Sequence, residues 1–120
     1  MGDATREELE RRLGEGGLVL LDVRSKAEYR GEAGYPCDAR QGHLPGARHV
    51  DVQALVAAGS PAELRALVGA PEGAEVVAYC HSGIRSATAV QVLRLAGYDA
   101  RNYPGSWHEW SSNDELPIEQ

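Results

Sequence analysis

The chain has 120 residues, of which 42% are hydrophobic and 25% charged, and its formal net charge is −6. This length and composition predict a single globular domain over residues 1–120, with a core large enough to fold without disulfides or metal ions. The acidic balance argues against a nucleic-acid partner, and the lack of a long apolar run or a signal-peptide core predicts a cytoplasmic protein that does not enter a membrane.

The first half of the chain alternates helical and strand-like segments. The expected elements, in order, are a helix opened by the capping box Thr5–Glu8, a buried strand over 18–23, a short helix over 26–30, a loop over 31–46 and a short strand over 47–50. The strand over 18–23 (LVLLDV) is apolar on both faces, which is typical of a parallel sheet. The glycines at 14, 16 and 17 end the first helix.

The second half continues the alternation. Ser60–Glu63 combines an N-cap, a proline at the first helical position and a capping glutamate, so it predicts a helix whose buried face is Leu64, Leu67 and Val68. Glu75–Tyr79 (EVVAY) predicts a third strand, and apolar residues at helical spacing from Ser86 onward predict the next helix. A short strand over 99–102 follows. The segment 103–120 carries two tryptophans without a clear period.

This order predicts an α/β fold: a central, mostly parallel sheet of about five strands with helices on both faces. Ligands of such sheets bind at the carboxyl ends of the strands. Asp22 and Cys80 both fall at such ends. They are therefore candidate site residues.

Cys80 lies where a strand ends and a helix begins, and a polar turn with a glycine follows it (Cys80-His-Ser-Gly-Ile-Arg-Ser86). Backbone N–H groups of such a turn and the helix dipole converge on the sulfur, which favours a thiolate at neutral pH. Gly83 is expected to let the turn curl without a side chain blocking it. Arg85 and His81 are candidate contacts for an anionic ligand, and Ser86 is expected to cap the helix or donate a hydrogen bond to the sulfur.

Several motifs in one order carry a family resemblance. They are Leu21-Asp-Val-Arg24, Glu28-Tyr29, Gly42-His-Leu-Pro-Gly-Ala47, Tyr79-Cys80 through Ser86, and the ending Tyr103-Pro-Gly-Ser-Trp-His-Glu-Trp110 with Leu116-Pro-Ile-Glu119. Together they resemble a rhodanese-like sulfurtransferase domain, and the ending is similar to that of the catalytic domain of thiosulfate and mercaptopyruvate sulfurtransferases. The match covers roughly residues 18 to 119.

The resemblance implies that Cys80 carries sulfane sulfur as a persulfide, without a cofactor. A small anionic donor such as thiosulfate gives its outer sulfur to the thiolate, and cyanide or a thiol then accepts it. Protein donors and acceptors are also possible partners. The substrate-binding residues implied are His81, Ser82, Gly83, Ile84, Arg85 and Ser86, with Asp22 and Arg24 nearby in supporting roles.

Structural roles compete with these assignments. For Asp22 and Arg24, we slightly favour a structural pairing with neighbours such as Glu28 over a supporting role in the site. Arg85 can instead form an outward salt bridge. His43 is expected to hold its turn by hydrogen bonds, and Trp107 and Trp110 to pack in the core. Cys37 is a candidate resolving thiol for Cys80. No metal site is expected, because the histidines and cysteines lack a ligand-pair spacing.

Two other functions remain open. Cysteine phosphatases and arsenate reductases also use a thiolate cradled by a turn with an arginine, but their loops are one residue longer than the four residues between Cys80 and Arg85. A shorter loop suits a single sulfur atom better than a tetrahedral phosphate. The second alternative is a sulfur carrier or partner-binding module that does not turn over.

Overall fold

Four parallel strands form the centre of the computed structural model, which describes residues 2–120. The strands are β1 (Leu18–Asp22), β2 (Arg48–His49), β3 (Glu75–Tyr79) and β4 (Asp99–Asn102), in the spatial order β2-β1-β3-β4. Every neighbouring pair is parallel, and Asp22 is in register with Tyr79. The expected mostly parallel sheet is confirmed, with four strands in the described residues instead of about five.

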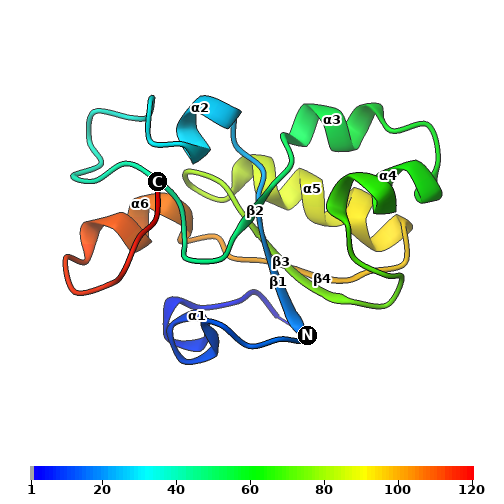
Figure 1. Ribbon diagram of the computed structural model, residues 1–120, viewed down its shortest axis with the longest axis horizontal. Helices are drawn as coiled ribbons and strands as arrows, with labels where there is room; N and C mark the ends of the chain where they lie inside the picture. The colour runs from blue at the N-terminus through cyan, green and yellow to red at the C-terminus, as the bar shows by residue number, and fades with distance from the viewer. Residues whose placement is uncertain (1) are drawn as a thin grey trace.

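Helices flank the sheet on both faces, as expected (Figure 1). They are α1 (Arg6–Arg12), α2 (Lys26–Tyr29), α3 (Val52–Ala57), α4 (Pro61–Val68), α5 (Ile84–Leu95) and α6 (Ser106–Ser112). Figure 1 shows α1 below the sheet and α3, α4 and α5 above it. Within residues 2–120, no helix has the length and apolar character needed to cross a membrane.

The strands send alternate side chains to two separate cores, because successive residues of a strand point to opposite faces. On one face, Leu21 and Val76 pack with the inner side chains of α5, including Leu93. On the other, Leu20 and Val77 pack with residues of α1 and α6. Trp107 and Trp110 belong to this second core and are fully buried, so their expected packing role is confirmed.

The helix caps follow the sequence with some differences. The Thr5 hydroxyl accepts the Glu8 N–H, but the Glu8 carboxylate pairs with Arg12 and Arg101 instead of completing a capping box. Ser60 caps α4 as expected. The assignment of Leu67 to the buried face of α4 is wrong: it is 45% exposed, whereas Leu64 and Val68 are buried, because the short helix offers the core only a narrow stripe.

Two helices were not expected from the sequence. The helix α3 has six residues, which are too few to show a period. The helix α6 lies in the segment 103–120, whose sequence shows no clear helical period. Trp107, Trp110 and Ser111 of α6 are buried and helically spaced. The serines and glycine around them have weak helix propensity and hide the pattern.

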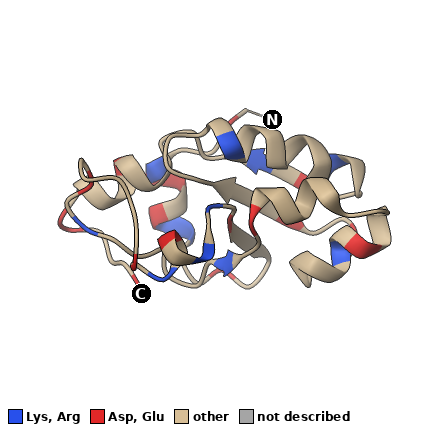
Figure 2. Cartoon of the chain, turned by 90° about the horizontal axis from the view of Figure 1, so that it is seen from above, with Lys and Arg blue, Asp and Glu red and all other residues tan. Residues whose placement is uncertain are grey.

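The amino end of β3 is held by an ion network. Arg12 and Arg101 both contact the Glu75 carboxylate, and both also contact Glu8. The hydrogen bond from Arg101 is the largest influence on Glu8 and, with Arg12, lowers the Glu8 pKa to about 2 although burial opposes this. Figure 2 shows basic and acidic segments interspersed along the chain, not gathered by sign.

Candidate functional site

Cys80 is the first residue after β3 and stands just before α5, as the sequence predicted. Its exposed fraction is only 1%. The preceding strand lies in the middle of the sheet, so its backbone is fixed by pairing on both sides. The cysteine therefore sits on a rigid support at the carboxyl edge of the sheet, where ligands of such sheets bind.

Three hydrogen bonds converge on the Cys80 sulfur. The Gly83 N–H donates to Sγ at 3.1 Å. The Ser86 N–H and the Ser86 hydroxyl both donate to it at 3.4 Å. These donors lie at the start of α5, whose dipole places its positive end at the same point. The turn is therefore arranged to hold a negative charge on sulfur.

The electrostatics of Cys80 reflect two opposing effects. Burial of the thiol raises its pKa, since a charge is poorly solvated inside the protein. The Ser86 hydroxyl and the backbone N–H groups of Ser86, Ser82 and Gly83 together lower it by more. The net result is a pKa below that of an ordinary thiol. A larger fraction of the sulfur is then present as the nucleophilic thiolate at neutral pH.

Gly83 is required for a reason partly different from the expected one. Its φ of 92° lies in the left-handed region that side chains rarely adopt. A Cβ at this position would also lie 2.9 Å from the Cα and the carbonyl oxygen of Pro104. The glycine therefore allows the turn to pack against the segment before α6, in addition to curling toward the sulfur.

Ser106 supports the turn from behind, and the sequence analysis missed it. Its hydroxyl accepts the Cys80 N–H at 3.1 Å and donates to the Tyr103 carbonyl at 2.8 Å. The residue is fully buried and adopts a φ of 57°, which is unusual for a residue other than glycine. The backbone N–H of Trp107 also donates to the Cys80 carbonyl. The only sequence signal was the Pro104-Gly105-Ser106 run itself.

The Ser86 hydroxyl donates a hydrogen bond to the Cys80 sulfur and does not cap the helix. The structure places the N-cap of α5 at Gly83, so Ser86 lies inside the first turn. Of the two expected roles, the capping role is therefore wrong and the hydrogen bond to sulfur is present. The helix begins earlier than its apolar pattern suggested, because Ile84 at its first position points outward and is 78% exposed.

Arg85 forms a two-pronged ion pair with Glu28 of α2. The distances are 2.8 Å from Nη1 to Oε1 and 3.1 Å from Nη2 to Oε2. The Glu28 carboxyl is mostly buried, which raises its pKa, yet Arg85 and the cap residue Ser25 bring that pKa down to about 2. The salt bridge considered from the sequence is therefore present. The Arg85 side chain keeps a third of its surface exposed.

The remaining turn residues face different surroundings. Ser82 is exposed and contributes its backbone N–H to Cys80. Ile84 borders an apolar hollow beside Arg85 that is also lined by Val52 and Val56. His81 stacks on Tyr35, with ring centroids 3.7 Å apart, and turns its Nε2 toward Asp38. The structure thus directs Ile84 and His81 away from the hydrogen bonds that surround the sulfur.

Asp22 and Arg24 form a buried pair with each other. Nη2 of Arg24 lies 2.7 Å from Oδ2 of Asp22 and also donates to the Gly42 carbonyl. The guanidinium lies near the rings of Tyr79 and Trp107. The structural pair favoured from the sequence is present, with Asp22 as the partner and not Glu28. It ties the end of β1 to the loop before β2.

The histidines divide into structural and site residues. His43 Nδ1 contacts the Tyr29 carbonyl at 2.7 Å and its ring stacks on Tyr29, which confirms its turn-holding role. His81 and His108 lie together with Asp38 and Cys37 in a separate cluster at the rim of the site. These four side chains carry atoms that ligate metals. Both cysteines are free thiols.

Comparison with known proteins identifies relatives of the whole globule. The family model of the rhodanese-like domain matches residues 5–113. A putative thiosulfate sulfurtransferase of Mycobacterium tuberculosis, SseB, is 41% identical over 113 residues, which cover 88% of this chain and 39% of that protein. The chain therefore spans less than half the length of this relative.

Two solved structures resemble the fold closely. The crystal structure of a probable thiosulfate sulfurtransferase superposes with a TM-score of 0.83 at 42% identity, covering 98% of this chain and 47% of the other. A human single-domain sulfurtransferase, TSTD1, superposes with a TM-score of 0.73 at 33% identity. That match covers 96% of this chain and 99% of the human one. The described residues thus resemble both half of a longer protein and the whole of a short one.

Proposed function

The chain belongs to the rhodanese-like domain family, and on this premise we propose that it is a sulfurtransferase that carries sulfane sulfur as a persulfide on Cys80. The observation that carries the proposal is the set of three hydrogen bonds that Cys80 Sγ accepts from Gly83 and Ser86. Nucleophilic sulfur chemistry needs a populated thiolate, and this turn supplies the stabilisation. The chemistry uses no cofactor.

In the proposed reaction the Cys80 thiolate attacks the outer sulfur of thiosulfate. The sulfur–sulfur bond of the donor breaks, and sulfite leaves with the bonding electron pair. A bond forms between Sγ and the transferred sulfur, whose terminal atom carries the negative charge. An acceptor nucleophile, either cyanide or a thiol, then attacks that atom and releases the thiolate. The turn N–H groups stabilise both anionic forms by the logic of an oxyanion hole.

Arg85 is the proposed contact for the charged end of the donor. Its guanidinium is fixed by Glu28, so the carboxylate offsets its charge and orients it at once. A third of the side chain remains exposed, which leaves donor groups for a sulfonate oxygen. We expect Arg85→Ala to raise the apparent KM for thiosulfate more than it lowers kcat, because Arg85 does not bind the sulfur itself. An unchanged KM would remove Arg85 from the donor site.

The persulfide itself is tested by intact mass after incubation with thiosulfate. Wild type is expected to gain one sulfur atom and to lose it on addition of cyanide, with thiocyanate formed. Cys80→Ser is expected to gain none, and Cys37→Ser to behave as wild type, which makes it the matched control. Sulfur addition to Cys80→Ser, or none to wild type, would refute the persulfide role of Cys80.

Sulfur loading, thiocyanate formation and phosphate hydrolysis together separate the alternative functions. A sulfur carrier or partner-binding module would load sulfur but form thiocyanate at no more than the uncatalysed rate. A phosphatase would hydrolyse an aryl phosphate, which is disfavoured because only four residues separate Cys80 from Arg85, one fewer than in such enzymes. Comparing thiosulfate with mercaptopyruvate at equal concentration identifies the preferred small-molecule donor. A protein donor is indicated if both load slowly while a protein persulfide loads fast.

The cytoplasm is the proposed location. Cys37 and Cys80 are both free thiols, and persulfide chemistry requires Cys80 to stay reduced. Reducing compartments keep such thiols free, whereas oxidising ones favour disulfides. Fractionation of cells that make the protein at its natural level checks this assignment.

A further inference from the structure

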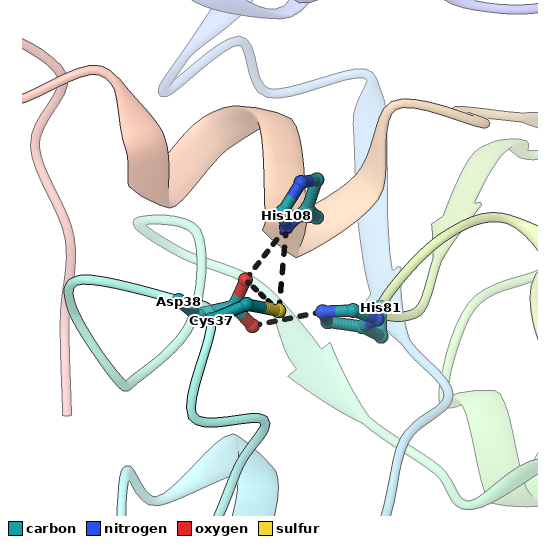
Figure 3. A group of neighbouring side chains, drawn as sticks. All are labelled: Cys37, Asp38, His81 and His108. Carbon is teal, nitrogen blue, oxygen red and sulfur yellow. Dashed lines mark hydrogen bonds and ion pairs between the residues drawn. The ribbon is translucent and has the colours of Figure 1, made fainter.

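Four side chains with metal-binding atoms gather at the rim of the Cys80 turn (Figure 3). Cys37 and Asp38 come from the loop between α2 and β2, His81 follows Cys80, and His108 lies on α6. One ligand atom of each lies within 4.8 Å of the others. Three segments that are distant in the sequence therefore bring their donor atoms to one point. Figure 3 shows the sulfur, the carboxylate and both rings directed toward each other.

The cluster holds two buried polar atoms that contact each other but make no hydrogen bond. The Asp38 side chain is only 1% exposed, and its Oδ2 has no hydrogen bond, nor does Nε2 of His81. These two atoms lie 2.9 Å apart, close enough for an ionic contact but without the alignment of a hydrogen bond. A cation between the two would satisfy both.

The donor set selects a particular class of ion. A thiolate, two imidazoles and a carboxylate suit Zn²⁺ and neighbouring transition ions, whereas Mg²⁺ and Ca²⁺ prefer oxygen ligands alone. Bond lengths of about 2.0–2.3 Å place tetrahedral zinc ligands roughly 3.3–3.8 Å apart. The contacts here are 2.8 Å from His108 Nδ1 to Asp38 Oδ1, 2.9 Å from His81 Nε2 to Asp38 Oδ2 and 4.0 Å from Cys37 Sγ to His108 Nδ1.

The two histidines contact different oxygens of Asp38, and one ligand atom of each residue lies within 4.8 Å of the others. Side-chain movements of about 1 Å therefore bring the ligands to the tetrahedral spacing. Cys37 is exposed and His108 is 54% exposed, which leaves both free to adjust. The buried Asp38 and the stacked His81 form the fixed half of the site. Ligation removes the proton of the Cys37 thiol, so binding should weaken as the pH falls.

We propose that Cys37, Asp38, His81 and His108 form a binding site for Zn²⁺ or a similar transition ion beside the Cys80 turn. The bound ion ties the loop that carries Cys37 to the turn that carries Cys80 and to α6. This revises the expectation that the chain has no metal site. The proposal does not depend on sulfur transfer, since Cys80 is not among the ligands.

Zinc binding is tested on the chelator-treated Cys80→Ser protein, in which Cys37 is the only thiol left. Titration calorimetry with Zn²⁺ is expected to show one equivalent bound with a Kd of roughly micromolar or below. Mg²⁺ is expected not to bind. Co²⁺ in place of Zn²⁺ is expected to give the visible absorption of a tetrahedral ion with a thiolate ligand.

Ligand variants in the same background locate the site. Cys37→Ser and His108→Ala are each expected to weaken Zn²⁺ binding at least about tenfold, as loss of one donor does. Both positions are exposed, so these substitutions leave the fold intact. His49→Gln is the control, because that histidine contacts the Arg24 carbonyl outside the cluster.

Protection of Cys37 from iodoacetamide gives a second readout of ligation. Zn²⁺ is expected to slow its alkylation in Cys80→Ser at least about tenfold, and His108→Ala is expected to remove most of this protection. The proposal would be overturned if calorimetry shows no Zn²⁺ binding to Cys80→Ser. It would also be overturned if Cys37→Ser and His108→Ala, in that background, bind Zn²⁺ as tightly as Cys80→Ser itself.

Discussion

The two ends of β3 place charge in opposite ways. At its first residue, Glu75 is paired with Arg12 and Arg101, and the Glu8 carboxylate completes the network. Just beyond its last residue, Cys80 faces backbone N–H groups and a serine hydroxyl, and Arg85 at the start of α5 is engaged by Glu28. One end satisfies its charges with opposite charges. The other end directs neutral dipoles at the sulfur, an arrangement that favours a thiolate.

This difference explains how one strand can be held in place by ion pairs at its amino end and position Cys80 at its carboxyl end. The paired side-chain charges at the amino end hold β3 in position through opposite charges. Aligned N–H groups stabilise a thiolate without blocking its approach to a sulfur donor. We therefore expect substitutions at the amino end of β3 to change stability alone. Substitutions at the carboxyl end should change sulfur chemistry.

The largest expected contrast comes from two glycines that flank β3 with similar φ angles. Gly83 (φ 92°) would place a Cβ against Pro104, whereas Gly73 (φ 87°) has open space around it. Gly83→Ala is expected to lower the free energy of unfolding by about 3 kcal/mol or more, and Gly73→Ala by about 1 kcal/mol. Urea unfolding measures both.

The same pair of variants should differ in chemistry. Gly83→Ala is expected to slow sulfur loading from thiosulfate roughly 100-fold, because the turn N–H groups lose their aim at the sulfur. Gly73→Ala is expected to load at the wild-type rate. Equal stability losses, or equal loading rates, would contradict the distinction between the two ends.

A smaller effect is expected from the hydroxyl that donates to Cys80. Ser86→Ala removes this hydrogen bond but keeps the backbone N–H, so the pKa of the thiol should rise. Alkylation of Cys80 by iodoacetamide at pH 7 is expected to slow about tenfold, equivalent to about 1.4 kcal/mol. Peptide mass analysis separates Cys80 from Cys37.

Ser82→Ala is the matched control for Ser86→Ala. Ser82 is exposed and contributes only its backbone N–H, which alanine retains. Its alkylation rate should equal that of wild type. If the two variants react alike, the Ser86 hydroxyl does not stabilise the thiolate.

The smallest expected effect is the pH dependence at the amino end. The Glu8 pKa of about 2 lies below its ordinary value of 4.5, so the unfolded chain binds more protons between these pH values. The contribution of Glu8 is therefore complete above about pH 4.5 and is lost as the pH falls toward 2. Glu8→Gln is expected to lose about 1 kcal/mol at pH 7, after allowance for solvent screening.

In the same window, Glu8→Gln should show a shallower decline of unfolding free energy than wild type. Glu10→Gln is the control, since Glu10 of the same helix pairs with Arg6 at a half-exposed position and contributes little. Chemical denaturation at several pH values measures the slopes. Parallel slopes for wild type and Glu8→Gln would show that the ion pairs with Arg12 and Arg101 do not lower the Glu8 pKa.

The sequence alone was enough for the parallel sheet and for the position of Cys80. The mostly apolar runs at 18–23 and 75–79 are typical of strands buried on both faces, and the strand-to-helix change after Tyr79 places the cysteine at the carboxyl edge of the sheet. The helix α3 was missed because its six residues are too few to show a period, and α6 because its serines have weak helix propensity. Such short helices acquire their stability from packing.

The tertiary structure alone decided which side chains meet. No local pattern pairs Arg85 with Glu28, brings Ser106 behind Cys80 or gathers Cys37, Asp38, His81 and His108 at one point. Each of these contacts joins segments separated by at least 26 residues, apart from the neighbours Cys37 and Asp38. The sequence by itself determined the position of Cys80 and the sheet that holds it, since both follow from local periodicity. The surroundings of that atom depend on how the loops cross the sheet edge, which is decided by packing of the whole chain.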